Sequence, residues 1–133
     1  MEPVGVIEPS GEYLQDVQSL CKQHEALLIF DEILTGFRIG YGGAQERYGI
    51  VPDLACYAKA LANGYPLSVV AGRRDVMELF DEIFFSFTFG GDTISLAAAQ
   101  ATLEKMQIEP VFEHLWNQGQ KLQDGYNELA REQ

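Results

Sequence analysis

The sequence predicts an α/β fold in which a mostly parallel sheet is flanked by helices. Short, continuous apolar runs alternate along the 133 residues with amphipathic stretches and with glycine-rich loops. Continuous apolar runs are typical of parallel strands buried on both faces, and strands that alternate with helices predict a layered sheet. The expected strands are residues 26–30, 54–58, 67–71 and 83–87. The expected helices are residues 10–22, 73–80, 94–106 and 109–133.

Each expected element has a local reason. Apolar residues recur at helical spacing from Tyr13 to Cys21, and Ser10 before them is a suitable N-cap, which predicts the first helix. The runs ALLIF, LACYA and LSVVA are continuously apolar, which favours buried strands. The first two runs end directly before Asp31 and Lys59. A later alanine-rich stretch and the apolar stripe that follows it predict the last two helices.

Composition indicates a globular protein of one domain and narrows its partners. Hydrophobic residues make up 47% of the chain and charged residues 22%, and the net charge is −11. Such an acidic chain is not expected to bind nucleic acid or an anionic membrane surface. No apolar run reaches the roughly 18 residues that a membrane span needs, and because Glu2 and Pro3 follow Met1 directly we expect no signal peptide. Cys21 and Cys56 lack metal-site spacing, so we expect no metal centre and a cytoplasmic protein with reduced cysteines.

Asp31 and Lys59 are the residues whose placement predicts chemistry. Both directly follow apolar runs, and they are 59 − 31 = 28 residues apart, about one crossover unit. Ligands of open α/β sheets bind beyond the carboxyl ends of the strands, so we expect both side chains at one edge and in one cavity. Pyridoxal phosphate needs such a pair. A lysine amine forms the Schiff base and later moves a proton, while a carboxylate keeps the ring nitrogen protonated.

Simpler interpretations of these two residues remain open. An aspartate at the end of a strand is often a turn residue or a helix cap, and a lysine there is often a solvated edge residue. The run ALLIFDE also matches the apolar strand and Asp-Glu pair that hold Mg²⁺ in ATPases. No GxxxxGK[ST] phosphate loop is present in the sequence, which leaves the ATPase the weaker alternative.

Three segments in succession resemble the signatures of class III pyridoxal-phosphate-dependent aminotransferases. They are LLIFDEILTGFRIG, VPDLACYAKALANGYPLSVVAGRRDVM and FTFGGDTISLAAAQATLEKM. The family's Asp-Glu and Thr-Gly-Phe-Arg pattern is met at residues 31–38, and its Pro-Asp, Lys and Gly-x-Pro pattern is met at residues 52–66. Its Thr-aromatic-x-Gly turn is met at residues 88–91. The run TGFRIG is somewhat more similar to the glutamate-1-semialdehyde aminomutase branch than to the ornithine branch.

The resemblance implies a fold, a reaction and three site residues. The fold would be the large domain of a fold-type I enzyme. The reaction would move an amino group between an amino donor and a keto or aldehyde acceptor, as a transaminase or an aminomutase does. Lys59 would form the Schiff base with pyridoxal 5'-phosphate, and Asp31 would pair with its ring nitrogen. Thr88 would bind the cofactor phosphate of the other subunit in a homodimer.

The sequence departs from the family pattern at Asp92-Thr93 and in the ALANGYP run after Lys59, which has fewer glycines than the family has there, and we expect it to be shorter than a complete member. Asp92 and Thr93 stand where the family has Asn-Pro, so we expect the Asp92 side chain to point away from a phosphate. Residues 1–133 are expected to form the C-terminal half of the large domain, ending in the long helix that would lead to a small domain absent from this chain. The alternative is a catalytically inert fragment or interaction module that keeps the fold signature.

Overall fold

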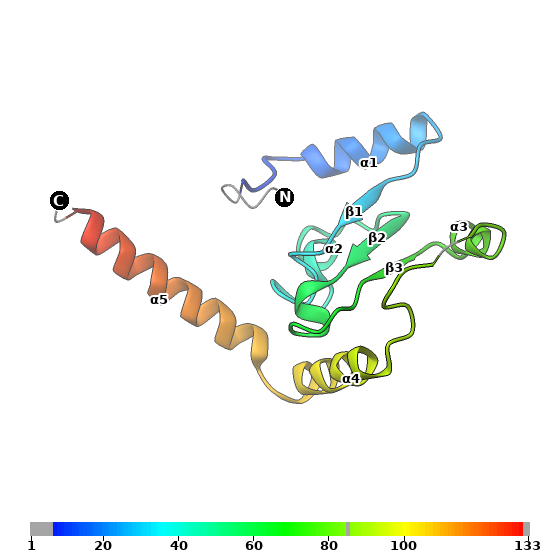
Figure 1. The fold of residues 1–133 in the computed structure, drawn as a ribbon. Coiled ribbons are helices and arrows are strands. Elements are labelled where there is room, and N and C mark those ends of the chain that lie inside the picture. Colours follow the sequence, from blue (N-terminus) through cyan, green and yellow to red (C-terminus); the bar gives the residue numbers. More distant parts are fainter. Residues whose placement is uncertain (1–6, 85, 132–133) are drawn as a thin grey trace.

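The structure, a computed structural model, describes residues 7–84 and 86–131. Its helices are α1 (Tyr13–Gln23), α2 (Gly43–Tyr48), α3 (Arg74–Met77), α4 (Thr93–Ile108) and α5 (Val111–Arg131), with the short 3-10 helices η1 (Lys59–Leu61) and η2 (Glu78–Asp81). Its strands are β1 (Ile29–Asp31), β2 (Leu54–Tyr57) and β3 (Val69–Gly72). Helix α1 lies on one side of the sheet and α4 on the other, while α5 runs out from the body (Figure 1).

The sheet is mixed, with strand order β1-β2-β3. Strands β1 and β2 are parallel, with Asp31 opposite Cys56, whereas β3 is antiparallel to β2. The sequence predicts a mostly parallel sheet, and among the described strands β3 differs from this prediction because it is antiparallel. The reason lies in the connection, because residues 58–68 hold only the single turn η1 between β2 and β3. A parallel return needs a longer crossover, usually with a full helix.

The fourth expected strand, residues 83–87, does not form among the residues described. Residue 85 lies outside them, and residues 83, 84, 86 and 87 have no strand structure. Phe84 is 96% exposed, and the described residues of this run pair with none of the three strands. An apolar run becomes a strand only where a neighbouring strand can take its hydrogen bonds.

The predicted helices form, with shifted starts. Helix α1 begins at Tyr13 with Glu12 at its N-cap, so the assignment of Ser10 as the cap was wrong. Gly11 between them has φ +56°, and this turn puts Ser10 outside the helix. The helix expected at residues 73–80 is divided into α3 and η2. Within the described ranges, no helix is long and apolar enough to cross a membrane.

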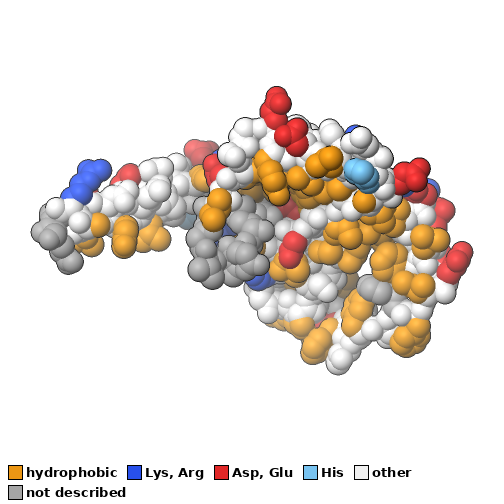
Figure 2. Space-filling view, turned by 90° about the horizontal axis from the view of Figure 1, so that it is seen from above, with side chains coloured by type: hydrophobic (Ala, Val, Ile, Leu, Met, Phe, Trp, Pro, Cys, Tyr) orange, Lys and Arg blue, Asp and Glu red, His pale blue; other side chains and the backbone are white. Residues whose placement is uncertain are grey.

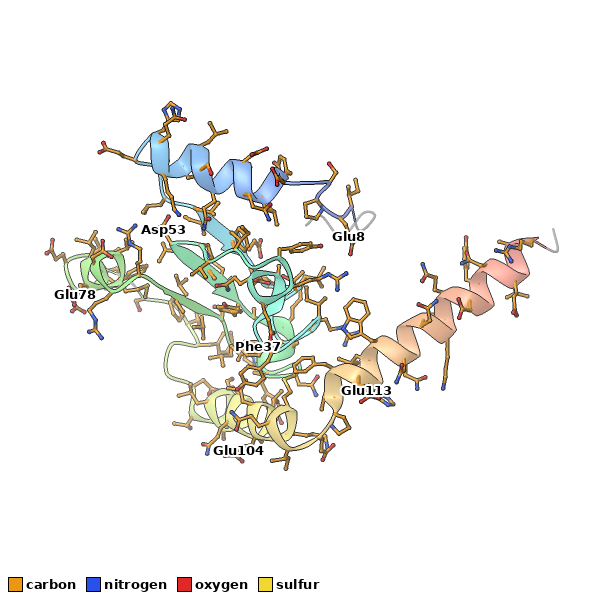
Figure 3. The ribbon with its side chains drawn as sticks, turned by 180° about the vertical axis from the view of Figure 1, so that it is seen from behind. Glu8, Phe37, Asp53, Glu78, Glu104 and Glu113 are labelled. Carbon is orange, nitrogen blue, oxygen red and sulfur yellow. The ribbon has the colours of Figure 1, made fainter. Side chains whose placement is uncertain are left out.

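A small cluster of buried hydrophobic residues lies between η1 and α4. Leu61, Ala62 and Ala99 form its centre, and Phe37, Tyr57, Leu67 and Leu103 pack against them. In Figure 3, Phe37 lies where the loop after β1 meets the α4 side of the molecule, and Asp53 lies at the opposite end of the sheet. Many hydrophobic side chains remain open on the body of the molecule (Figure 2).

Helix α5 is attached to the body through its first half only. Its Trp116 indole donates a hydrogen bond to the carbonyl of Ile39 at 3.0 Å, and the Arg47 guanidinium lies 5.2 Å from the centre of that indole ring. Beyond Trp116, the apolar stripe that the sequence predicts is exposed, as at Leu122 and Tyr126.

Candidate functional site

Asp31 and Lys59 lie at the same edge of the sheet. Asp31 is the last residue of β1, and Lys59 comes two residues after Tyr57, which ends β2. The two strands are parallel, so their carboxyl ends meet at this edge, where ligands of α/β sheets bind. The sequence predicts this placement from the two apolar runs alone.

Both side chains are exposed and available to a ligand. One carboxylate oxygen of Asp31, Oδ1, accepts the N–H of Ile33 at 3.0 Å, which fixes the direction of the carboxyl group. Neither Asp31 nor the Lys59 amine takes part in an ion pair within residues 7–84 and 86–131. Lys59 also has φ +39°, a conformation that only a few per cent of non-glycine residues adopt. Backbone strain of this kind persists where surrounding structure enforces it, and it clusters at functional sites.

Glu32, directly after Asp31, is a buried structural carboxylate that sequence reasoning left without a role. Its side chain is 1% exposed and accepts the backbone N–H groups of Ala44 and Gln45 at 2.9 Å each, at the start of α2. The Thr35 hydroxyl donates a further hydrogen bond to it. Of the Asp-Glu pair, Asp31 is therefore exposed to a ligand, whereas Glu32 is buried and has a structural role. Because Glu32 is occupied by protein donors, the Asp-Glu pair does not fit the Mg²⁺ site of the ATPase alternative.

Gly43 marks how tightly the chain packs around this carboxylate. Its φ is +67°, and a Cβ added there would lie 2.5 Å from a Glu32 oxygen. Only glycine accepts both the conformation and the approach. The signal in the sequence was the Gly42-Gly43 pair at the start of α2, which could not be interpreted without the position of Glu32.

Asp53 ties together the other ends of the strands. Its carboxylate accepts the N–H of Leu28 at 2.8 Å and the Arg73 guanidinium at 2.6 Å. These bonds, first the one from Leu28 and then the one from Arg73, hold the pKa of Asp53 below its ordinary value. Gly72 lets β3 approach, because a Cβ there would lie 2.2 Å from the Asp53 carbonyl oxygen. Asp53 therefore stabilises the sheet at the end away from Lys59.

Thr88 lies in the exposed turn that leads into α4. It lines a hollow with Pro66, Leu67, Gly90 and Gly91. Asp92, at the end of this turn, is the N-cap of α4, and its carboxylate accepts the backbone N–H and the hydroxyl of Ser95 at 2.8 and 2.6 Å. The Ser95 hydrogen bonds hold the pKa of Asp92 below its ordinary value.

The three predicted site residues line three different hollows of this chain. Asp31 lies beside Tyr13, Leu14 and Tyr48, in a hollow between the sheet, α1 and α2. The hollow of Lys59 is lined by Leu34, Arg38, Ala60, Asn63, Gly64 and Tyr65. The expectation that Asp31 and Lys59 face one cavity is therefore not met among the described residues. Strand direction brings the two strand ends to one edge, but it does not supply the walls of a shared cavity.

Comparison with known proteins decides the family. The model of the class III aminotransferases matches residues 2–133. The chain belongs to the class III aminotransferase family. Its relatives include the glutamate-1-semialdehyde 2,1-aminomutase of Roseiflexus castenholzii, 41% identical over 139 residues that cover 99% of this chain and 32% of the relative. The same enzyme of Clostridium tetani is 41% identical and is covered to 33%.

Solved structures of aminotransferases share the fold of this class III chain. The pyridoxal-phosphate internal aldimine form of the Sphingopyxis FumI protein has a TM-score of 0.85 and 30% sequence identity, over 91% of this chain and 29% of that protein. The structure is therefore the α/β fold of the fold-type I transaminases, as predicted. The chain spans about a third of the length of the curated relatives that it matches.

Proposed function

We propose that this chain carries the reacting lysine of a pyridoxal-phosphate-dependent enzyme that transfers an amino group between an amino donor and a keto or aldehyde acceptor. The observation that carries the proposal is the position of Asp31 and Lys59 at the carboxyl ends of adjacent parallel strands in a class III aminotransferase fold. The two glutamate-1-semialdehyde aminomutases favour an aminomutase, in which donor and acceptor are one molecule.

The residues at this edge fit the cofactor. The Lys59 amine has no ion-pair partner among the described residues, and one oxygen of Asp31 is directed by Ile33 while the side chain stays exposed. Pyridoxal phosphate, when bound, supplies an aldehyde that condenses with an amine and a ring that withdraws electrons from the attached carbon. Lys59 would hold the cofactor through its amine and, once displaced by substrate, would move a proton at the substrate Cα. Asp31 would hold the proton on the ring nitrogen.

Thr88 would bind the cofactor phosphate of the partner subunit in a homodimer. In support of this assignment, Thr88 is exposed and precedes the N-terminus of α4, where backbone N–H groups favour an anion. It also lines a hollow that contains neither Asp31 nor Lys59, as expected of a residue that serves another subunit. Asp92 does not oppose this role, because its charge is directed to Ser95.

Two further assignments belong to the same proposal. Residues 1–133 would form part of the large cofactor-binding domain, with α5 leading to a small domain. The protein would be cytoplasmic, which the free thiols of Cys21 and Cys56 favour, because disulfides are rare in reducing compartments.

The alternative is an inert fragment or interaction module that keeps the fold signature. Three observations favour it: the site residues are exposed, they line separate hollows, and the chain spans about a third of its relatives. Under either proposal we expect no aminotransferase turnover from these 133 residues alone, so the test between the two is a measurement of cofactor attachment.

The experiment is to add limiting pyridoxal phosphate, reduce with borohydride and locate the trapped group by peptide mass. The chain has four lysines, Lys22, Lys59, Lys105 and Lys121, which serve as internal references for one another. The proposed function predicts that Lys59 is labelled first and that its labelling saturates. A Lys59→Ala chain should be labelled only at the other three lysines, and no more strongly there than in the original chain. Equal labelling of all four lysines in the original chain would support the inert fragment instead.

A further inference from the structure

We propose that Gln45 and Tyr57 are positioning residues that hold the strand end carrying Asp31 in register with the strand end carrying Lys59. The proposal rests on the proposed function, since it concerns the relative placement of the two groups that would hold the cofactor. Neither Gln45 nor Tyr57 has a role in the proposed binding of the cofactor.

The first link joins the residue after Asp31 to α2. The buried Glu32 carboxylate accepts the N–H groups of Ala44 and Gln45, so the first turn of α2 is fixed to the end of β1. The close approach at Gly43 leaves the carboxylate little room to move. Any shift of α2 therefore moves the backbone that follows Asp31.

The second link joins α2 to the strand that leads to Lys59. The Gln45 side-chain amide donates a hydrogen bond to the Tyr57 hydroxyl at 2.5 Å, in a partly buried position. Within residues 7–84 and 86–131, no other side-chain hydrogen bond joins residues 32–48 to residues 54–61. Burial raises the pKa of the Tyr57 hydroxyl above its ordinary value, although the bond from Gln45 acts in the opposite direction.

The Tyr57 ring is itself held by the loop after Asp31. A Cβ added at Gly36 would lie 2.5 Å from the Tyr57 ring, and the Phe37 ring centre lies 5.5 Å from that of Tyr57. The ring is thus fixed by packing and the hydroxyl by Gln45. Tyr57 is the last residue of β2, so its position sets where the chain enters the strained turn at Lys59.

Backbone pairing alone does not explain this arrangement. The ladder between β1 and β2 continues to the N–H of Glu32, which donates to the Cys56 carbonyl at 2.9 Å, and then the two chains separate. Beyond that point, the two loops are held together by the packing of Phe37 on the Tyr57 ring and by the polar connection through Glu32, α2, Gln45 and Tyr57. Asp31 and Lys59 both lie at the point of separation.

The test is Tyr57→Phe, which keeps the ring and its packing and removes only the hydroxyl. The matched control is Tyr41→Phe, because the Tyr41 hydroxyl also accepts one side-chain hydrogen bond, from Gln107 at 3.1 Å. Amide hydrogen exchange of the 133-residue chain is measured in residues 32–48 and in residues 58–61. We expect Tyr57→Phe to speed exchange in both segments by about fivefold, the effect of one neutral hydrogen bond on a local opening equilibrium. The Tyr41 bond joins residues 32–48 to α4 and not to β2, so Tyr41→Phe should leave residues 58–61 unchanged.

A second readout asks whether the link positions Lys59. The readout is the share of borohydride-trapped cofactor that is found on Lys59 and not on Lys22, Lys105 or Lys121. This share should fall in Tyr57→Phe and in Gln45→Ala. The double variant should show the same fall as either single variant, because the two residues share one bond. The proposal is overturned if exchange rises in residues 58–61 only, or if the Lys59 share is unchanged while exchange rises. Should the original chain show no preference for Lys59, the proposed function fails, and the exchange data still decide whether the link exists.

Discussion

Replacing Glu32 should destabilise the protein more than replacing any exposed glutamate, although Glu32 touches no ligand in the proposed site. Glu32→Ala removes the acceptor of two backbone N–H groups and of the Thr35 hydroxyl, in a position that is 1% exposed. A buried donor left without a partner costs about 1–3 kcal/mol, and Glu32→Ala leaves two backbone N–H groups and one hydroxyl in that state. We therefore expect the free energy of unfolding to fall by about 3–5 kcal/mol, a large part of the roughly 5–15 kcal/mol that holds a domain folded.

The assay is urea unfolding followed by circular dichroism, with two further variants. Glu32→Gln keeps the side-chain shape and one acceptor oxygen, so its loss should be smaller than that of Glu32→Ala. Glu46→Ala is the matched control, because Glu46 is an exposed glutamate on the same helix that also accepts one backbone N–H, from Gly42 at 2.8 Å. The Glu46 change should cost less than about 1 kcal/mol. If Glu32→Ala costs no more than Glu46→Ala, the buried carboxylate does not anchor α2 and the reasoning is refuted.

Two further variants test the packing of the sheet and the start of α4. Gly72→Ala should destabilise the chain by about 1–3 kcal/mol in the same assay, because its Cβ would meet the Asp53 carbonyl. The control, Gly119→Ala in the open part of α5, should be neutral or stabilising. Equal effects of the two changes would contradict the close approach at Gly72. Because the folded pKa of Asp92 is lowered from its ordinary 3.8, its contribution to stability is present above pH 3.8 and is lost as the pH falls further through the lowered folded pKa. Asp92→Asn should keep the cap and flatten that part of the profile of unfolding midpoint against pH, and an unchanged profile would show that Asp92 is not the titrating group.

The parts of the fold that the sequence predicts are those set by local patterns. The ALLIF run is followed by Asp31 and the LACYA run by Lys59, and the two strands that form there end at or just before these residues. The last two helices also form where alanine content and helical periodicity predict them. For such elements, the local pattern and the tertiary structure favour the same conformation.

The parts that differ depend on partners far away in the chain. The LSVVA run predicts a strand, but its direction depends on the short connection through η1, which no periodicity reveals. The apolar residues 83–87 could form a strand only by pairing with a segment elsewhere in the chain, and the described residues among them pair with none of β1, β2 and β3. Glu32 looks like the second half of an Asp-Glu pair, and its burial is decided by Ala44 and Gln45, twelve and thirteen residues later.

The central claim is that Asp31 and Lys59 act on one cofactor molecule, and its most direct test is the dependence of Lys59 labelling on pyridoxal phosphate concentration. The measurement compares the original chain with Asp31→Asn and with Asp16→Asn, an exposed aspartate on α1. A hydrogen bond to a charged group contributes about 1.5–3 kcal/mol, so Asp31→Asn should raise the half-saturating concentration at Lys59 by about tenfold or more, while Asp16→Asn leaves it unchanged. Identical saturation curves for all three chains would contradict the claim that Asp31 and Lys59 form one site.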